Sequence, residues 1–287
     1  MANLKGGNFQ KQVKDAFHRL EAFGVGRIGK EDNLTHSDKL AEKREMYLKD
    51  VANHFIAENI EGKLNSLFTK ENLDKFFDER FENLSDKTQE NYLRGFSSML
   101  KGLEQQNIHI PLHLEDKGYF DDKVAQIKDQ SEVIIENRYI DNVQDVISNL
   151  YEDRAISGLL AQTQLELSIR QAEAYELLQN PSQYIDNGIV SNLVGKGNHY
   201  YEPKSISFEL EQKILNNSDA LVDKSTYYKD LQKYNITSHD FRFTSARDKY
   251  EEKIRSGISE REAKLQVSEI LNHKRAAITD YYLSRTN

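Results

Sequence analysis

The 287-residue chain contains no cysteine, so it has no disulfide framework and no thiolate metal site. It has no apolar run that approaches the ~18 residues needed to span a membrane. Its first residues, MANLKGGNFQ, also lack the apolar core of a signal peptide. These absences favour a soluble cytoplasmic protein that works without metal, cofactor or membrane. The length is sufficient for two domains.

The chain also lacks an excess of positive charge. A net charge of −8 argues against nucleic-acid binding if the charge is taken as a whole. However, residues 1–30 carry six basic and two acidic side chains, and residues 225–287 carry twelve basic and nine acidic. This distribution is compatible with a protein that clamps DNA, whereas composition alone favours an ordinary acidic protein.

The first part of the chain has helical periodicity. Residues 1–32 are expected to form a flexible basic arm, because glycines interrupt a short amphipathic helix there; a frayed terminus is an equal alternative. Residues 33–115 predict a small helical domain, with helices at residues 37–60, from Thr69, and from Ser85. Pro111 is expected to end it, since proline cannot continue a helix from within.

Residues 116–138 are polar and predict a linker, with a short helix at 121–130, before a second domain at 139–287. Helical patterns cover 141–179, and the period changes over 182–208, where Asn187-Gly188 indicates a hairpin. We expect a three-stranded antiparallel meander there, followed by helices within 207–235 and at 240–256, 259–271 and 275–284. The predicted fold is therefore mostly α, with a helical N-terminal domain and an α+β C-terminal domain.

Residues suited to phosphoryl transfer gather near the end of the sequence. Arg242 can bind two phosphate oxygens through its forked guanidinium. His239 and His273 can donate hydrogen bonds or move protons near neutral pH. A tyrosine of the pair Tyr281-Tyr282 can attack phosphorus as a covalent nucleophile. Each residue alone would more often be structural, and it is their order and spacing together that indicate a functional site.

This pattern resembles the tyrosine recombinase (phage integrase) family. Its signature is His-x-x-Arg, then Leu-Gly-His, then a tyrosine nine residues further on. His239 to Arg242 matches the first box, and Leu271-Asn272-His273 matches the second, with asparagine in place of glycine. Nine residues beyond His273 is Tyr282, which the resemblance identifies as the nucleophile.

Two upstream segments extend the resemblance. Arg170-Gln171-Ala172-Glu173 is similar to the family's first arginine box, in which the arginine binds the scissile phosphate and Glu173 helps to hold it. The turn Gly195-Lys196-Gly197-Asn198 is similar to the family's hairpin turn, whose lysine protonates the leaving 5′ oxygen. Lys196 is therefore the expected general acid, with Lys204 as the alternative.

The resemblance implies a site-specific DNA recombinase or integrase that works through a covalent 3′-phosphotyrosine, without metal or ATP. It also implies a homotetramer bound to double-stranded recombination sites, with the helical N-terminal domain as the core-binding domain. The positions expected to bind DNA are Lys87, Arg94, Lys274 and Arg275.

Several features depart from the family pattern. Phe243 replaces a common histidine, the interval from Arg170 to His239 is short, and the interval from Arg242 to His273 is long. Only Leu283–Asn287 follows the nucleophile, so exchange between protomers would involve the helix that carries Tyr282. The alternatives are a type IB topoisomerase-like relaxase, a non-catalytic DNA-binding relative, and a helical protein unrelated to nucleic acid if the six residues do not meet.

Overall fold

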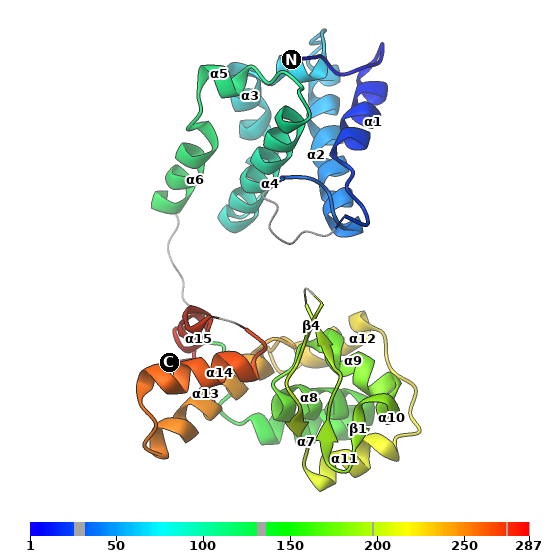
Figure 1. Cartoon of the computed structure of the whole chain (residues 1–287), viewed down its shortest axis with the longest axis vertical. Helices are drawn as coiled ribbons and strands as arrows, with labels where there is room; N and C mark the ends of the chain where they lie inside the picture. Colours follow the sequence, from blue (N-terminus) through cyan, green and yellow to red (C-terminus); the bar gives the residue numbers. More distant parts are fainter. Residues whose placement is uncertain (26–31, 131–135, 197, 274, 287) are drawn as a thin grey trace. The chain divides into compact units, whose positions relative to one another are not determined.

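The computed structural model describes residues 1–25, 32–130, 136–196, 198–273 and 275–286. The chain divides into two units, Met1–Val133 and Ile134–Asn287, and each unit has its own hydrophobic core. Helices dominate both units, and the strands lie in the second one (Figure 1). Within the described residues, no helix has both the length and the apolar character needed to cross a bilayer. The predicted fold class, mostly helical with a small antiparallel sheet in the C-terminal half, is confirmed at this level.

The first unit is built around phenylalanine and leucine side chains of its longer helices. Thr69 caps α3 by accepting a hydrogen bond from the Asn72 backbone, as the sequence predicts. Helices α2 and α4 approach closely at Gly95, where a Cβ would collide with the Tyr47 hydroxyl. The elements are α1 (Phe9–Leu20), α2 (Asp38–Ala57), η1 (Leu64–Leu67), α3 (Lys70–Phe81), α4 (Asp86–Gln105), α5 (Leu112–Glu115) and α6 (Tyr119–Gln130).

The expected N-terminal arm is wrong for residues 1–25. Leu4 and Val13 are buried in the core of the first unit, and Ala2 donates a backbone hydrogen bond to Asn107. Apolar residues at helical spacing give α1 a face that packs on α2, which explains why the segment is folded. Residues 26–31, the rest of that prediction, lie outside the described residues.

The expected end of the first unit is also too early. Pro111 does not terminate the unit, because α5 begins directly after it and α6 follows. Helix α6 contacts α4, and its Val124 and Phe120 side chains belong to the core. The predicted linker at 116–138 is therefore folded over Tyr119–Gln130, and the boundary between the units follows Val133.

The second unit begins with helices and continues into two small strand pairs. Helix α8 packs between α7 and α13, and α9 follows it after a sharp turn. The elements before the last three helices are α7 (Val143–Asp153), α8 (Ala155–Leu167), α9 (Gln171–Gln179), α10 (Pro181–Tyr184), β1 (Ile185–Asp186), β2 (Ile189–Val190), β3 (Val194–Gly195), β4 (His199–Tyr200), β5 (Lys204–Ser205), α11 (Phe208–Leu215) and α12 (Lys224–Gln232).

The strands are antiparallel, but their order differs from the expected meander. Strand β2 pairs with β1 and with β5, whereas β3 and β4 form a separate two-stranded ribbon. Asn187 and Gly188, both at positive φ, make the β1–β2 turn that the sequence predicts. Asn192 also has positive φ, which turns the chain between β2 and β3 and separates the ribbon from the sheet.

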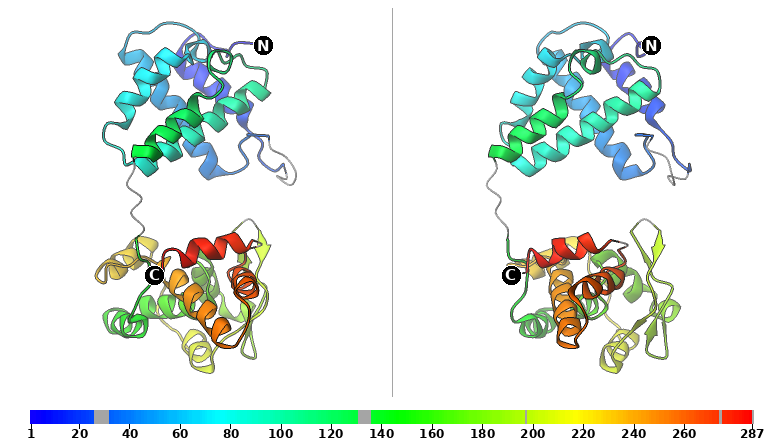
Figure 2. Two further views of the ribbon diagram at one scale, coloured as in Figure 1. Left: turned by 90° about the vertical axis from the view of Figure 1, so that its left-hand side faces the viewer. Right: turned by 60° about the vertical axis from the view of Figure 1, so that its left-hand side comes forward.

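Three helices close the chain: α13 (Asp240–Arg255), α14 (Glu260–Ile270) and α15 (Ala276–Leu283). Helix α15 contacts both α13 and α14, and both views in Figure 2 place this red helix against the orange pair. Phe243 and Tyr282 are part of a small core between these helices. The last turn of the chain is therefore packed against the helix that carries Arg242.

Candidate active site

Arg170 stands at the junction of α8 and α9. Ser168 ends α8 in the left-handed conformation, at φ 56°, and this turn places Arg170 as the N-cap of α9. The buried Glu173 carboxylate accepts hydrogen bonds from the Arg170 backbone N–H and from its Nη1, the latter at 3.2 Å. Glu173 thus holds Arg170 through a helix cap as well as an ion pair.

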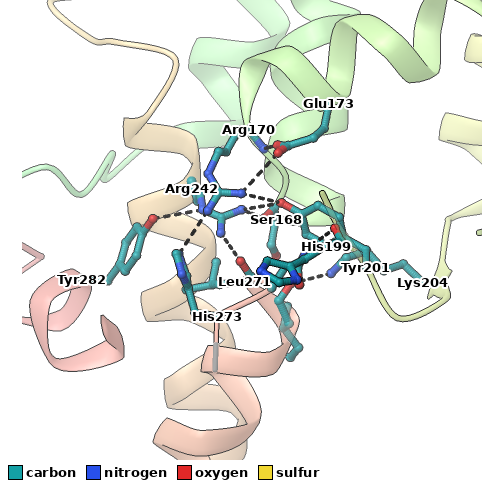
Figure 3. A network of polar contacts seen from close by, with 12 residues as sticks. Ser168, Arg170, Glu173, His199, Tyr201, Lys204, Arg242, Leu271, His273 and Tyr282 are labelled. Atoms are coloured by element: carbon teal, nitrogen blue, oxygen red, sulfur yellow. Dashed lines mark hydrogen bonds and ion pairs between the residues drawn. The ribbon is translucent and has the colours of Figure 1, made fainter. Parts of the chain in front are cut away.

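Arg242 lies on the first turn of α13, and its side chain is fully buried. Its guanidinium donates to the backbone carbonyl oxygens of Ser168 and Leu271, to the Tyr201 hydroxyl at 3.3 Å, and to the Tyr282 hydroxyl at 3.0 Å (Figure 3). Every one of these acceptors is neutral.

No carboxylate among the described residues forms a salt bridge with Arg242. A buried cation without an anionic partner is costly to maintain. Arg170 Nη1 lies 3.1 Å from the same Tyr201 hydroxyl that Arg242 contacts. Two guanidiniums therefore meet at one hydroxyl, and their combined charge favours a bound anion beside it.

Tyr282 is buried on α15, and its oxygen accepts the hydrogen bond from Arg242 Nε. Its ring packs on Phe243, with centroids 4.6 Å apart. The neighbouring Tyr281 is 47% exposed and lies beside Arg285 instead. Of the two adjacent tyrosines, Tyr282 is thus the one that reaches Arg242.

His239 precedes α13, and its ring lies 5.8 Å from the Tyr282 ring, centroid to centroid. Burial, with the nearby charges of Arg242 and Arg138, lowers the pKa of His239 to about 4. The imidazole is consequently neutral at pH 7 and has a lone pair that can accept a proton.

His273 follows α14 and approaches Arg170, whose Nη2 lies 3.3 Å from His273 Nε2. For Arg170 to donate to Nε2, the His273 proton must be on Nδ1. Burial and the charges of Arg242 and Arg170 lower the pKa of His273 to about 4. The preceding Asn272 has a φ of 53°, a conformation that glycine and asparagine tolerate, which accounts for asparagine in the expected glycine position.

The two lysine candidates occupy different environments. Lys196 is exposed at the turn between β3 and β4. Lys204 is partly buried on β5, and its Nζ donates to the Ile270 carbonyl at 2.7 Å. Burial, with the charge of Arg242, lowers the pKa of Lys204 to about 7. The ammonium of Lys204 also lies 5.3 Å from the Tyr201 ring centroid.

The structure therefore gathers Arg170, Glu173, His239, Arg242, His273 and Tyr282 around one point, while Lys196 stands at an exposed turn. Tyr201 is a member of this network that the sequence reasoning did not select. The signal was weak, because Tyr200-Tyr201 reads as a strand with alternating faces; Tyr200 is 64% exposed and Tyr201 is buried.

The expected DNA-binding side chains are not gathered in the same way. Lys87 and Arg94 are exposed on α4, and both pair with the Glu90 carboxylate, at 2.7 and 3.0 Å. Arg275 is exposed at the start of α15. Lys274 lies outside the described residues. Each described position is accessible, and each remains a prediction.

Within the described ranges, no group of three or more histidine, cysteine, aspartate or glutamate residues could hold a metal ion.

Comparison with protein-family models, curated proteins and solved structures gives no match.

Proposed function

We propose that the protein is a DNA strand transferase of the tyrosine recombinase type. The observation that carries the proposal is the placement of Tyr282. Its hydroxyl is held by Arg242, and Arg242 and Arg170 donate to one common point. A nucleophile beside two convergent guanidiniums is the arrangement needed for attack on a phosphodiester.

In the proposed reaction, the arginines bind the non-bridging oxygens of the scissile phosphate. The Tyr282 oxygen forms a bond to phosphorus, and the bond from phosphorus to the 5′ oxygen breaks. The phenolic proton goes to His239, and a lysine, Lys196 in our assignment, gives a proton to the 5′ oxygen. When Arg170 turns to the phosphate, the His273 proton can move from Nδ1 to Nε2, and Nε2–H then donates a hydrogen bond to the phosphate. Removal of one such donor typically slows a reaction by ~10²–10³.

The charges support this division of roles. Tyr282 accepts a hydrogen bond from Arg242, so its own proton is available to another group. His239 is neutral at pH 7 because of its lowered pKa. The negative charge of a bound phosphate would oppose the arginine charges and make this imidazole more basic. The phosphotyrosine ester conserves the bond energy, so a 5′-hydroxyl can reverse the step without ATP.

The test is incubation with a suicide DNA substrate that carries a nick near the cleavage point. We expect a covalent protein–DNA adduct with the wild type and none with Tyr282→Phe. Tyr281→Phe is the matched control and should retain the adduct, because the Tyr281 ring lies beside Arg285 and no hydrogen bond among the described residues joins it to Arg170 or Arg242. Loss of the adduct only in Tyr281→Phe would overturn the assignment.

A second candidate is a type IB topoisomerase-like relaxase. One chain brings its own Tyr282 to its own Arg242, so a single copy holds both groups. A relaxase needs no more than this, whereas recombination needs the proposed homotetramer on two double-stranded sites. Relaxation of supercoiled plasmid without sequence dependence would favour the relaxase. Binding of DNA with no adduct on any substrate would favour a non-catalytic relative.

A further inference from the structure

The hydroxyl of Tyr201 occupies the point on which the two arginines converge. Arg170 Nη1 lies 3.1 Å from this oxygen, and Arg242 Nη1 lies 3.3 Å from it (Figure 3). Both are N–H donors, so the phenolic oxygen accepts from both cations. A neutral oxygen thus lies between the two guanidiniums, and their charge favours an anion next to it.

The position of the Tyr201 ring is tightly determined. The side chain is only 5% exposed, and its backbone N–H donates to Leu193 at 2.9 Å. Gly195 makes room for the ring, because a Cβ at that residue would lie 2.9 Å from Tyr201 Cε2. The ammonium of Lys204 flanks the ring on another side. These constraints hold the hydroxyl at the edge of the two guanidiniums rather than elsewhere in the core.

The Tyr201 hydroxyl still has an unused hydrogen-bond donor. A phenol has two acceptor positions and one donor, and the arginines use the acceptors. Among the described residues, the Tyr201 O–H has no hydrogen-bond acceptor. Burial raises the pKa of Tyr201, so the phenol keeps its proton at neutral pH. A protonated, immobilised hydroxyl beside two cations is suited to donate to an incoming anionic oxygen.

We propose that Tyr201 is a third phosphate-binding residue, whose hydroxyl donates to one non-bridging oxygen of the scissile phosphate alongside Arg170 and Arg242. The proposal rests on the proposed strand-transfer function and names a residue that the family pattern does not supply. The competing role is that of a spacer, in which Tyr201 only keeps the two guanidiniums apart.

The first experiment compares Tyr201→Phe with the wild type in single-turnover cleavage of the nicked substrate. Phenylalanine keeps the ring and removes only the hydroxyl. We expect the rate to fall by about 10²-fold, the effect of removing one donor to a transition-state oxygen. Tyr200→Phe is the matched control, because Tyr200 is the exposed neighbour on β4, and its rate should be unchanged. An unchanged rate in Tyr201→Phe overturns the proposal.

The second experiment separates donation from spacing. Two methylphosphonate diastereomers of the substrate each replace one non-bridging oxygen with a methyl group. If Tyr201 donates to one oxygen, Tyr201→Phe and the wild type should react equally on the diastereomer that lacks that oxygen, and differ on the other. A spacer would slow the natural phosphate and both diastereomers by the same factor, and this outcome overturns the proposal.

A third measurement distinguishes failure of this proposal from failure of the proposed function. Inorganic phosphate can be titrated into each protein while the arginine side-chain N–H resonances are followed by NMR. We expect phosphate to bind the wild type and to bind Tyr201→Phe about tenfold more weakly. If Tyr201→Phe weakens phosphate binding but the wild type forms no DNA adduct, strand transfer is refuted and Tyr201 is kept as an anion ligand. Equal phosphate affinity in both proteins would refute the role of Tyr201 itself.

Discussion

Asn272 Nδ2 donates to the backbone carbonyl of His199 at 3.0 Å. This bond joins the loop that carries His273 to the β3–β4 ribbon, whose turn carries Lys196. The ribbon approaches closely at this point, since a Cβ on Gly195 would lie 2.8 Å from the Asn272 amide. Asparagine in this position therefore connects two parts of the candidate site as well as tolerating its positive φ.

We expect Asn272→Gly to release the ribbon without unfolding the unit. Glycine accepts a φ of 53° and lacks the amide, so the ribbon loses one hydrogen bond, about 0.5–1.5 kcal/mol. Hydrogen exchange of the ribbon amides should accelerate by about two- to tenfold, the factor that corresponds to this free energy. Asn272→Ala should instead lower the melting temperature, because alanine in the left-handed region costs about 1–2 kcal/mol. Equal ribbon exchange in Asn272→Gly and the wild type would contradict the connection.

The identity of the proton donor can be decided with a sulfur leaving group. A 5′-phosphorothiolate needs no general acid, because a thiolate leaves readily without a proton. The exposed amine of Lys196 can approach bound DNA and act as this acid. We therefore expect Lys196→Ala to cleave normal DNA about 10²–10³-fold slower than the wild type and to recover the wild-type rate on the phosphorothiolate.

Lys204→Ala is the comparison for this experiment. The Lys204 ammonium is fixed on the Ile270 carbonyl, so we expect its loss to slow cleavage of both substrates by the same factor. Recovery of Lys204→Ala alone would transfer the role of general acid to Lys204. In that case cleavage of normal DNA should also decline as the pH rises through about 7, because the protonated amine is the active form and the pKa of Lys204 is lowered to that value.

The sequence predicted most helices well because their determinants are local. The periodicity of residues 208–215 and 240–255 is contained in the segments themselves, and Ser207 caps the first of them. Pairing of β2 with β5 could not be predicted, because it depends on a turn at Asn192 and on contacts between distant segments. The packing of Leu4 and Val13 in the core could not be predicted for the same reason, since their partners lie on other helices.

The candidate site also combines residues that local spacing predicts with residues that only long-range contacts bring in. Spacing in the sequence selected Arg242 and Tyr282, and the structure joins them by a hydrogen bond. Tyr201 has no spacing rule that connects it to either arginine. Its place depends on the contact between the residue that follows β4 and the α8–α9 junction, which are distant in the sequence. Lys204 is the alternative lysine in the sequence, but its lowered pKa follows from burial, which a sequence does not reveal.

Stability should depend on pH through the two histidines. In the folded protein the pKa values of His239 and His273 are about 4, whereas an unfolded histidine has a value of ~6.5. The unfolded chain therefore binds more protons between these values. The stabilising contribution is fully present above pH ~6.5 and is lost as the pH falls towards 4.

Urea denaturation of the whole chain from pH 4.5 to 8 measures this effect. After allowance for the partial exposure of both rings, we expect a loss on the order of 2 kcal/mol on acidification. His239→Gln and His273→Gln should each reduce the slope of stability against pH below 6.5, because glutamine does not titrate. A slope that both substitutions leave intact would show that other groups cause the acid sensitivity.

The packing of α15 predicts that Tyr282 acts within its own chain. Thr279 Oγ1 donates to the Lys264 carbonyl, and the Lys264 ammonium lies 2.9 Å from Asp280, so α15 is attached to its own α14. The Arg138 backbone N–H also donates to the Arg285 carbonyl at 2.6 Å, which secures the end of the chain. Exchange between protomers would have to break these contacts.

Complementation between two inactive variants tests this prediction. Tyr282→Phe keeps both arginines, and Arg170→Ala keeps the nucleophile. If Tyr282 acts on a phosphate bound by its own chain, a mixture of the two should form no adduct, because neither chain has a complete site. A mixture of Tyr282→Phe with the wild type is the positive control, and a size tag shows which chain is attached. Adduct on the Arg170→Ala chain, only in the mixture, would prove that the nucleophile is donated to a neighbouring protomer.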